Sequence, residues 1–119
     1  MVKQRLAIIL LGPPGAGKGT QARRISGELK VPHVSTGDML REALRDRTEL
    51  GQGAQAYMEA GALVPDELVN AVVAERLARE DCRRGFVLDG YPRTIAQAEF
   101  LRGLLEKNGA RILAIGIVV

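Results

Sequence analysis

A glycine-rich segment near the N-terminus, residues 12–20, carries the clearest chemical pattern in the sequence. It reads Gly-Pro-Pro-Gly-Ala-Gly-Lys-Gly-Thr and matches the G-x-x-x-x-G-K pattern of a phosphate-binding loop. Glycines let successive backbone N–H groups turn inward, and a helix that follows presents the positive end of its dipole to the same place. Lys18 adds a mobile cation for the β- and γ-phosphates of a nucleotide. The segment therefore predicts a site for a polyphosphate.

One position departs from the common form of this loop. Gly19 directly follows Lys18, where a serine or threonine usually offers its hydroxyl to Mg²⁺, and the nearest hydroxyl is that of Thr20. We expect magnesium to rely on carboxylates elsewhere in the chain, with water between them and the ion.

Two further polar segments follow predicted strands. Residues 35–38 read Ser-Thr-Gly-Asp, and Asp89 closes the apolar run 86–88. In open α/β sheets, ligands bind beyond the carboxyl ends of the strands, so these segments and the glycine-rich loop should share one rim. Taken alone, Asp38 would be a charge in the first turn of a helix and Asp89 a turn residue. Their shared location favours a functional role for both.

Two arginines lie on the same rim. Arg41 follows Asp38 by three residues on one helical face, and Arg93 follows the turn after Asp89. A guanidinium suits phosphate oxygens better than an ammonium does. We expect six other arginines to be solvated: Arg23, Arg24, Arg45, Arg47, Arg83 and Arg84.

Other residues with chemical potential have simpler structural interpretations. Thr94 and Gln97 form the T-x-x-Q pattern of a helix capping box. His33 has no partner nearby in the sequence and is interpreted as structural. Cys82 lies in a charged loop, which predicts an ordinary surface thiol. Helical spacing places two more residues in the core: Tyr57 and Met58.

Strands that alternate with helices must position these side chains. Apolar runs predict strands at residues 6–11, 33–35, 86–88 and 112–119. Periodic apolar residues predict helices beginning at Lys18, near Asp38, at Pro65 and at Thr94. Two glycines within residues 48–53 predict a hinge between short helices, and Gly61 and Gly109 are expected to end helices. This alternation predicts an α/β fold with a parallel sheet.

Composition narrows the class of protein. The chain has 119 residues, of which 46% are hydrophobic and 3% aromatic, with a formal net charge of +3. These values favour a globular domain with an aliphatic core and disfavour nucleic-acid binding through stacked aromatic rings. No apolar run approaches a membrane span, and no secretory signal is expected at the N-terminus. With the single Cys82, these features predict a cytoplasmic protein without disulfides.

The motifs together resemble the adenylate kinase family. The segments that carry the resemblance are GPPGAGKGTQA, STGDMLR, GALVPDELV and GFVLDGYPRT, in the order and spacing of the family. The resemblance implies phosphoryl transfer between Mg·ATP and AMP to give two ADP. It also implies a P-loop sheet with helices on both faces and strand order 2-3-1-4-5.

The resemblance implies a role for each matching position. The residues that would hold ATP are Gly15, Ala16, Gly17, Lys18, Gly19 and Thr20. Those that would bind AMP are Thr36, Arg41, Ala62, Leu63, Val64, Gly90, Tyr91, Pro92, Arg93 and Gln97. Lys18 and Arg93 would be catalytic, and Asp38 and Asp89 would orient Mg²⁺ through water. Residues 35–64 would form a mobile monophosphate-binding insert between the core segments 1–34 and 65–119.

The family pattern extends beyond this chain. A lid, further arginines and a fifth strand would be missing from a chain that stops at Val119, so we expect little activity from the isolated chain. The strand at 112–119 would then be an exposed edge, and we expect self-association through it.

Two alternatives to an adenylate kinase remain open. One is a kinase for UMP or CMP, and the other is a nucleotide-binding fragment without catalysis. Thr36 and Gln97 match the pattern for AMP.

Overall fold

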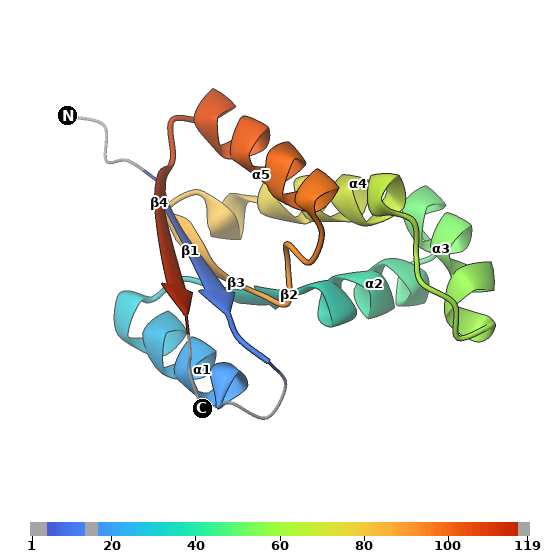
Figure 1. Cartoon of the computed structure of the whole chain (residues 1–119), viewed down its shortest axis with the longest axis horizontal. Coiled ribbons are helices and arrows are strands. Elements are labelled where there is room, and N and C mark those ends of the chain that lie inside the picture. The colour runs from blue at the N-terminus through green and yellow to red at the C-terminus, as the bar shows by residue number, and fades with distance from the viewer. Residues whose placement is uncertain (1–4, 14–16, 117–119) are drawn as a thin grey trace.

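The computed structural model describes residues 5–13 and 17–116, which form a parallel sheet with helices on both faces (Figure 1). The strands are β1 (Leu6–Leu11), β2 (His33–Ser35), β3 (Gly85–Asp89) and β4 (Arg111–Gly116). Their order is β2-β3-β1-β4, and all three pairings are parallel. The predicted α/β class and the predicted order of these four strands are confirmed.

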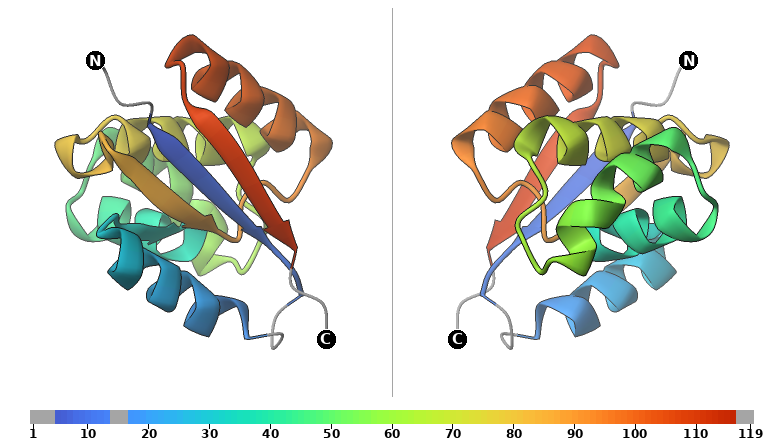
Figure 2. Two further views of the ribbon diagram at one scale, coloured as in Figure 1. Left: turned by 90° about the vertical axis from the view of Figure 1, so that its left-hand side faces the viewer. Right: turned by 90° about the vertical axis from the view of Figure 1, so that its right-hand side faces the viewer.

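Helices connect every pair of successive strands. They are α1 (Lys18–Leu29), α2 (Thr36–Arg45), α3 (Glu49–Glu59), α4 (Asp66–Leu77) and α5 (Ile95–Lys107), with a short 3₁₀ turn η1 (Glu80–Cys82) before β3. Figures 1 and 2 show α1 on one face of the sheet and α4 and α5 on the other. The pair α2 and α3 extends away from the sheet beyond β2 (Figure 1).

The central strand β1 supplies both halves of the core, because successive side chains point to opposite faces. Ile8 and Leu10 pack with Ala22 of α1. Ala7 and Ile9 face the larger cluster that includes residues of α4 and α5. These four of the six β1 side chains are buried, as the continuous aliphatic run predicts for a strand covered on both sides.

The break between helices that was predicted at residues 48–53 lies earlier, at residues 46–48 between α2 and α3. The Thr48 hydroxyl accepts a hydrogen bond from the backbone N–H of Gly51 and caps α3, so the chain is helical from Glu49. A Cβ on Gly51 would lie 2.2 Å from the carbonyl oxygen of Ala43 in α2. Glycine fits here because α2 and α3 approach closely, and a side chain would clash with the Ala43 carbonyl.

Three smaller predictions also differ from the structure. Pro65 precedes the first residue of α4 and is its N-cap, one position before the site predicted for it. Cys82 is fully buried, although charged neighbours predicted a surface thiol. Tyr57 is 41% exposed and does not belong to the core.

Within residues 5–13 and 17–116, none of the helices is long and apolar enough to cross a bilayer.

Candidate phosphate-binding site

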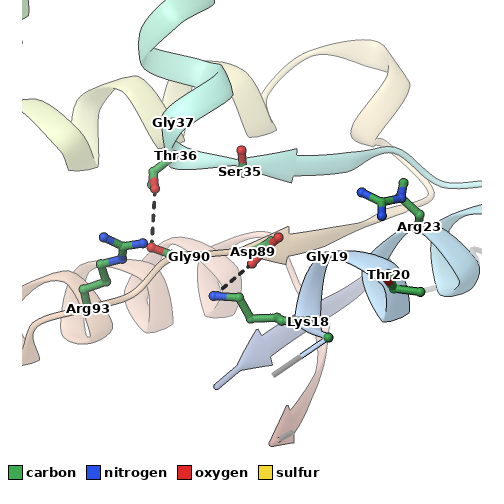
Figure 3. Close-up of a pocket in the computed structure, with 11 residues that line it drawn as sticks. Lys18, Gly19, Thr20, Arg23, Ser35, Thr36, Gly37, Asp89, Gly90 and Arg93 are labelled. Atoms are coloured by element: carbon green, nitrogen blue, oxygen red, sulfur yellow. Dashed lines mark hydrogen bonds and ion pairs between the residues drawn. The ribbon is translucent and has the colours of Figure 1, made fainter. Parts of the chain in front are cut away.

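A cavity of about 480 Å³ opens at the carboxyl ends of β1, β2 and β3. One side is formed by the start of α1, with Gly17, Lys18, Gly19, Thr20 and Arg23. The other side is formed by Ser35, Thr36, Gly37, Asp89, Gly90 and Arg93. Figure 3 shows these side chains around the cavity. The three polar segments therefore do converge on one rim, as their positions after predicted strands require.

Lys18 and Asp89 form the electrostatic centre of the cavity. The Lys18 Nζ lies 3.1 Å from Asp89 Oδ1, and both side chains are about 15% exposed (15% and 14%). The ammonium also lies 3.4 Å from the carbonyl oxygen of Gly12. Lys18 begins α1, so its cation stands where the positive end of the helix dipole also favours an anion.

His33 has a partner that sequence reasoning missed. Its Nε2 lies 3.1 Å from Asp89 Oδ2, so Asp89 is held between Lys18 and His33. The contact joins residues 56 positions apart, on the paired strands β2 and β3. The pairing of β2 with β3 brings these two residues together, and the local sequence does not show it. His33 helps to fix the carboxylate that faces the cavity.

Thr36, Gly90 and Arg93 form the rim opposite Lys18 (Figure 3). The Thr36 hydroxyl donates to the carbonyl oxygen of Gly90 at 3.4 Å. Gly90 has φ +82°, and a Cβ there would lie 3.4 Å from both the Thr36 hydroxyl and Arg93 Nη2. A side chain at this position would be strained and would crowd both groups. The sharp turn therefore brings Arg93 back to the rim.

Asp38 and Arg41 turn toward each other beside the cavity. The Arg41 guanidinium donates to Asp38 Oδ1, and both side chains are about two-thirds exposed (68% and 67%). This hydrogen bond, with a second from the Ser35 side chain, holds the pKa of Asp38 below its ordinary value. Neither residue lines the cavity, although Arg41 lies against Gly37, which does.

Several residues expected at the AMP site lie elsewhere. Ala62, Leu63 and Val64 form the loop after α3, where Leu63 is 94% exposed. Tyr91 is 1% exposed and points into the core, where its hydroxyl donates to Asn70 Oδ1 at 2.6 Å. Burial raises the pKa of Tyr91 to about 12, with a smaller contribution from Asp66.

Gln97 and Pro92 lie in different surroundings. Gln97 is 6% exposed and its side-chain amide is bonded within the protein. Pro92 follows a cis peptide bond and, with Tyr91, borders a second cavity of about 220 Å³ that Lys18 and Arg93 also line. Gly15 and Ala16, expected to bind ATP, lie outside the described residues.

Arg23 is the cavity residue that the sequence analysis missed. It lies one and a half turns into α1 and was expected to be solvated, yet it lines the cavity beside Gly19 and Thr20. The spacing from Lys18 to Arg23 is not a helical repeat of three or four, so the motif did not reveal it. A Cβ on Gly19 would be 3.7 Å from Arg23 Nη1, which places the guanidinium along the loop side of the cavity.

The oxygen donors at the cavity suit magnesium held together with a nucleotide. Asp89 offers a carboxylate and Thr20 a hydroxyl, and hard oxygen ligands are those that Mg²⁺ prefers. Among residues 5–13 and 17–116, no group of three or more His, Cys, Asp or Glu side chains could cage a metal. In proteins, Mg²⁺ is usually bound by one or two carboxylates and keeps several waters.

A glycine-rich loop between a buried parallel strand and a helix, with a lysine facing an aspartate on the neighbouring strand, defines the class of P-loop nucleotide-binding α/β proteins. Residues 10–118 match the protein-family model described as adenylate kinase, so the chain belongs to the adenylate kinase family.

Individual relatives agree with the family assignment. The chain is 56% identical, over 92% of its length, to the adenylate kinase of Caldanaerobacter subterraneus subsp. tengcongensis. It is 58% identical over 90% to that of Anaeromyxobacter dehalogenans, and 56% identical over 94% to that of Archaeoglobus fulgidus. The matches cover 50%, 50% and 52% of these relatives, so the chain spans about half the length of the curated relatives it matches.

Proposed function

We propose that this chain is the phosphate-binding half of an adenylate kinase, which transfers a phosphoryl group from Mg·ATP to AMP and gives two ADP. The observation that carries the proposal is the Lys18–Asp89 pair at the mouth of the P-loop cavity, within a chain of the adenylate kinase family. In the reaction, an AMP phosphate oxygen bonds to the γ-phosphorus of ATP. The bond from that phosphorus to the β–γ bridging oxygen breaks, and ADP leaves.

The residues of this chain would act through positioning and charge, which supply most of the catalysis in phosphoryl transfer. Gly15, Ala16, Gly17, Gly19 and Thr20 would hold the ATP phosphates. Lys18 and Arg93 would stabilise the charge on the transferring group from opposite rims of the cavity. Magnesium bound with ATP would neutralise further phosphate charge, and Asp89 and Asp38 would hold its waters.

The AMP site would be completed by a movement of residues 35–64. The proposal is supported by the position of α2 and α3, which extend away from the sheet (Figure 1), and by the exposure of Leu63 in the loop that follows them. Ala62, Leu63 and Val64, together with Arg41, would approach the cavity only when this insert closes. We further propose that the protein acts in the cytoplasm on ATP and AMP, without nucleic acid or membrane partners.

Nucleotide binding by the chain itself tests the first part of the proposal. Calorimetry should show binding of ATP or ADP, and Lys18→Ala should weaken it at least tenfold, about 1.4 kcal/mol. Equal affinity for both proteins would overturn the assignment of the P-loop.

Kinetics of a longer chain test the reaction and its substrate. The remaining half can be supplied from a family relative, and AMP, UMP and CMP compared as acceptors in a coupled ADP-formation assay. AMP should be preferred, and Arg93→Ala should lower kcat/KM far more than Arg24→Ala, a matched exposed arginine of α1. A better rate with UMP or CMP would favour the pyrimidine-nucleotide alternative. ATP binding without turnover would favour a nucleotide-binding fragment.

We also propose that the 119-residue chain self-associates through β4. This strand is an edge of the described sheet, and Ile112 and Leu113 are 43% and 48% exposed. An aliphatic edge with unpaired backbone groups invites pairing with another chain. Sedimentation at micromolar concentration should show a dimer or larger species, and Leu113→Lys should shift it toward monomer. A monomer at every concentration would contradict this proposal.

A further inference from the structure

Hydrogen bonds join the turn that carries Arg93 to the first turn of α4. The Gln97 Oε1 accepts a hydrogen bond from the backbone N–H of Arg93 at 2.8 Å. The Gln97 Nε2 donates to Asp66 Oδ1 at 2.9 Å, and the Thr94 hydroxyl donates to Asp66 Oδ2 at 3.2 Å. One carboxylate of α4 thus holds two residues of the segment that begins α5.

The direction of these hydrogen bonds fixes the orientation of the Gln97 side-chain amide. A backbone N–H can only donate, so the Gln97 amide must turn its oxygen toward Arg93. The amide nitrogen then faces α4 and needs an acceptor there. Asp66 supplies one, because a carboxylate accepts with both oxygens. Gln97 is 6% exposed, so water has little access to replace either bond.

Further hydrogen bonds join α4 to the segment of Arg93 one turn further along the helix. The Tyr91 hydroxyl donates to Asn70 Oδ1 at 2.6 Å and lies 3.3 Å from the carbonyl oxygen of Gln97. Tyr91 is 1% exposed and Asn70 is 9% exposed. Buried polar bonds of this kind fix one arrangement, because breaking one leaves a group without a partner. The turn from Tyr91 to Gln97 is therefore held at both ends.

Arg93 itself gains its position from this framework. Its backbone N–H is the group fastened by Gln97, while its guanidinium lies at the rim beside Thr36 and Gly90 (Figure 3). Arg93 and Lys18 line the same two cavities from opposite sides. A small shift of the turn would move the guanidinium relative to a phosphate that Lys18 holds, and such interactions are sensitive to displacements of about 1 Å.

We infer that Asp66 is a positioning residue for the phosphate site: through the Gln97 amide it sets the place of Arg93 at the rim of the cavity. The inference rests on the proposed phosphate-binding function. Asp66 does not line the cavity, and its side chain accepts hydrogen bonds from Gln97 and Thr94. Its effect should therefore depend on the presence of the Arg93 guanidinium.

A double-mutant cycle with inorganic pyrophosphate as the probe tests this dependence in the 119-residue chain. Arg93→Ala should weaken pyrophosphate binding by roughly tenfold. Asp66→Ala should weaken it by roughly fourfold when Arg93 is present and by less than about twofold when Arg93 is alanine. A purely structural role for Asp66 would lower affinity equally in both backgrounds, and that result would overturn the inference.

A matched control separates positioning from simple charge. Glu67 is the neighbouring acidic residue in the first turn of α4 and is exposed. Removing either acidic residue makes the protein more positive, which by itself should favour pyrophosphate. Glu67→Ala should therefore leave affinity unchanged or slightly higher, whereas Asp66→Ala should lower it. Equal effects of the two substitutions would contradict the inference.

Exchanging donor and acceptor provides a rescue experiment that does not depend on a cavity-forming substitution. Gln97→Glu keeps the acceptor for the Arg93 N–H but places a second carboxylate against Asp66, so affinity should fall. Adding Asp66→Asn supplies a donor toward the new glutamate and keeps an oxygen toward Thr94, so affinity should return to within about twofold. A double variant as weak as Gln97→Glu alone would count against the inference.

Lys18→Ala separates the proposed phosphate site from the proposed role of Asp66. If pyrophosphate binds equally well to this variant, the proposed phosphate site fails, whatever Asp66 does. If Lys18→Ala weakens binding but Asp66→Ala does not, the phosphate site stands and the positioning role of Asp66 is wrong.

Discussion

The two ends of the parallel sheet each place a cation beside β1, but the two cations have different partners. At the carboxyl end, Lys18 lies 3.1 Å from the Asp89 carboxylate and borders open space. At the amino end, Arg5 Nε donates to the carbonyl oxygen of Cys82 at 2.9 Å, and its Nη2 donates to that of Leu77. The Arg5 guanidinium also lies 5.1 Å from the centre of the Phe86 ring.

The difference follows from the helix ends that meet the sheet on each side. Lys18 lies at the N-terminus of α1, where the helix dipole is positive and backbone N–H groups can bind an anion. Arg5 bonds to Leu77 at the C-terminus of α4, where free carbonyl groups seek a cation. The same physical rule therefore leaves one end of the sheet ready for phosphate and satisfies the other end internally.

The largest expected effect tests the internal role of Arg5. Arg5→Met should lower the free energy of unfolding by about 3 kcal/mol, because two backbone carbonyls lose a charged donor and Phe86 loses a cation–π contact. Pyrophosphate affinity should stay within about twofold. Urea denaturation and calorimetry measure the two quantities. Arg84→Met, an exposed neighbour at the same end, is the control and should cost less than about 0.5 kcal/mol.

Lys18 should show the opposite pattern, with a large effect on binding and a small one on stability. Lys18→Ala should weaken ADP binding at least tenfold, about 1.4 kcal/mol. The free energy of unfolding should change by less than about 1 kcal/mol, because Asp89 keeps its contact with His33 and the cavity admits water. A loss of stability as large as that of Arg5→Met would remove the distinction between the two ends.

The sequence predicts the carboxyl end far better than the amino end. The glycine-rich motif predicts Lys18 and the end of an apolar run predicts Asp89, and parallel strands bring their carboxyl ends together. Arg5 was not identified, because its partners are backbone carbonyls 72 and 77 residues away. No side-chain pattern marks a residue whose carbonyl will accept such a bond.

Packing explains most of the other differences between prediction and structure. Cys82 has charged neighbours in sequence, yet η1 turns it inward beside the Arg76 guanidinium, and its burial raises the pKa of its thiol. The contact between Gly51 and the Ala43 carbonyl depends on how α2 and α3 cross. Each of these depends on tertiary contacts that local propensity does not encode.

A third prediction concerns Tyr91, which follows β3 at the carboxyl end but is buried away from the cavity. Folding raises its pKa to about 12. From about pH 10 the unfolded chain releases this proton while the native protein keeps it, so stability should fall by up to about 1.4 kcal/mol per pH unit between pH 10 and 12. Below about pH 9 this group should contribute almost no pH dependence.

Tyr91→Phe isolates that contribution from other groups that titrate at high pH. At pH 8 the variant should be less stable by about 1 kcal/mol, because Asn70 loses its donor. The gap to the unmodified protein should narrow as pH rises above 10, measured by urea denaturation at each pH. A gap that stays constant to pH 11.5 would show that Tyr91 ionises equally easily in both states.

The smallest expected effect belongs to an ion pair at the amino end, between side chains alone. Arg76 and Asp81 form two hydrogen bonds of 2.8 and 2.9 Å, and the pair lowers the pKa of Asp81. Because Asp81 is 51% exposed, solvent screens the pair, and Asp81→Asn should cost only about 0.5 kcal/mol near pH 7. Because the pKa of Asp81 is lower in the folded protein, its carboxylate stabilises the fold above the unfolded pKa of about 3.8. This stabilisation is lost as pH falls through the folded pKa, so the difference in stability between Asp81→Asn and the unmodified protein should vanish in acid.

Glu80→Gln is the control, since its carboxylate is 89% exposed and lies 3.9 Å from Arg83, and it should have no measurable effect. A cost for Asp81→Asn near that of Arg5→Met would mean that side-chain pairs stabilise this end of the sheet as strongly as bonds from Arg5 to the backbone.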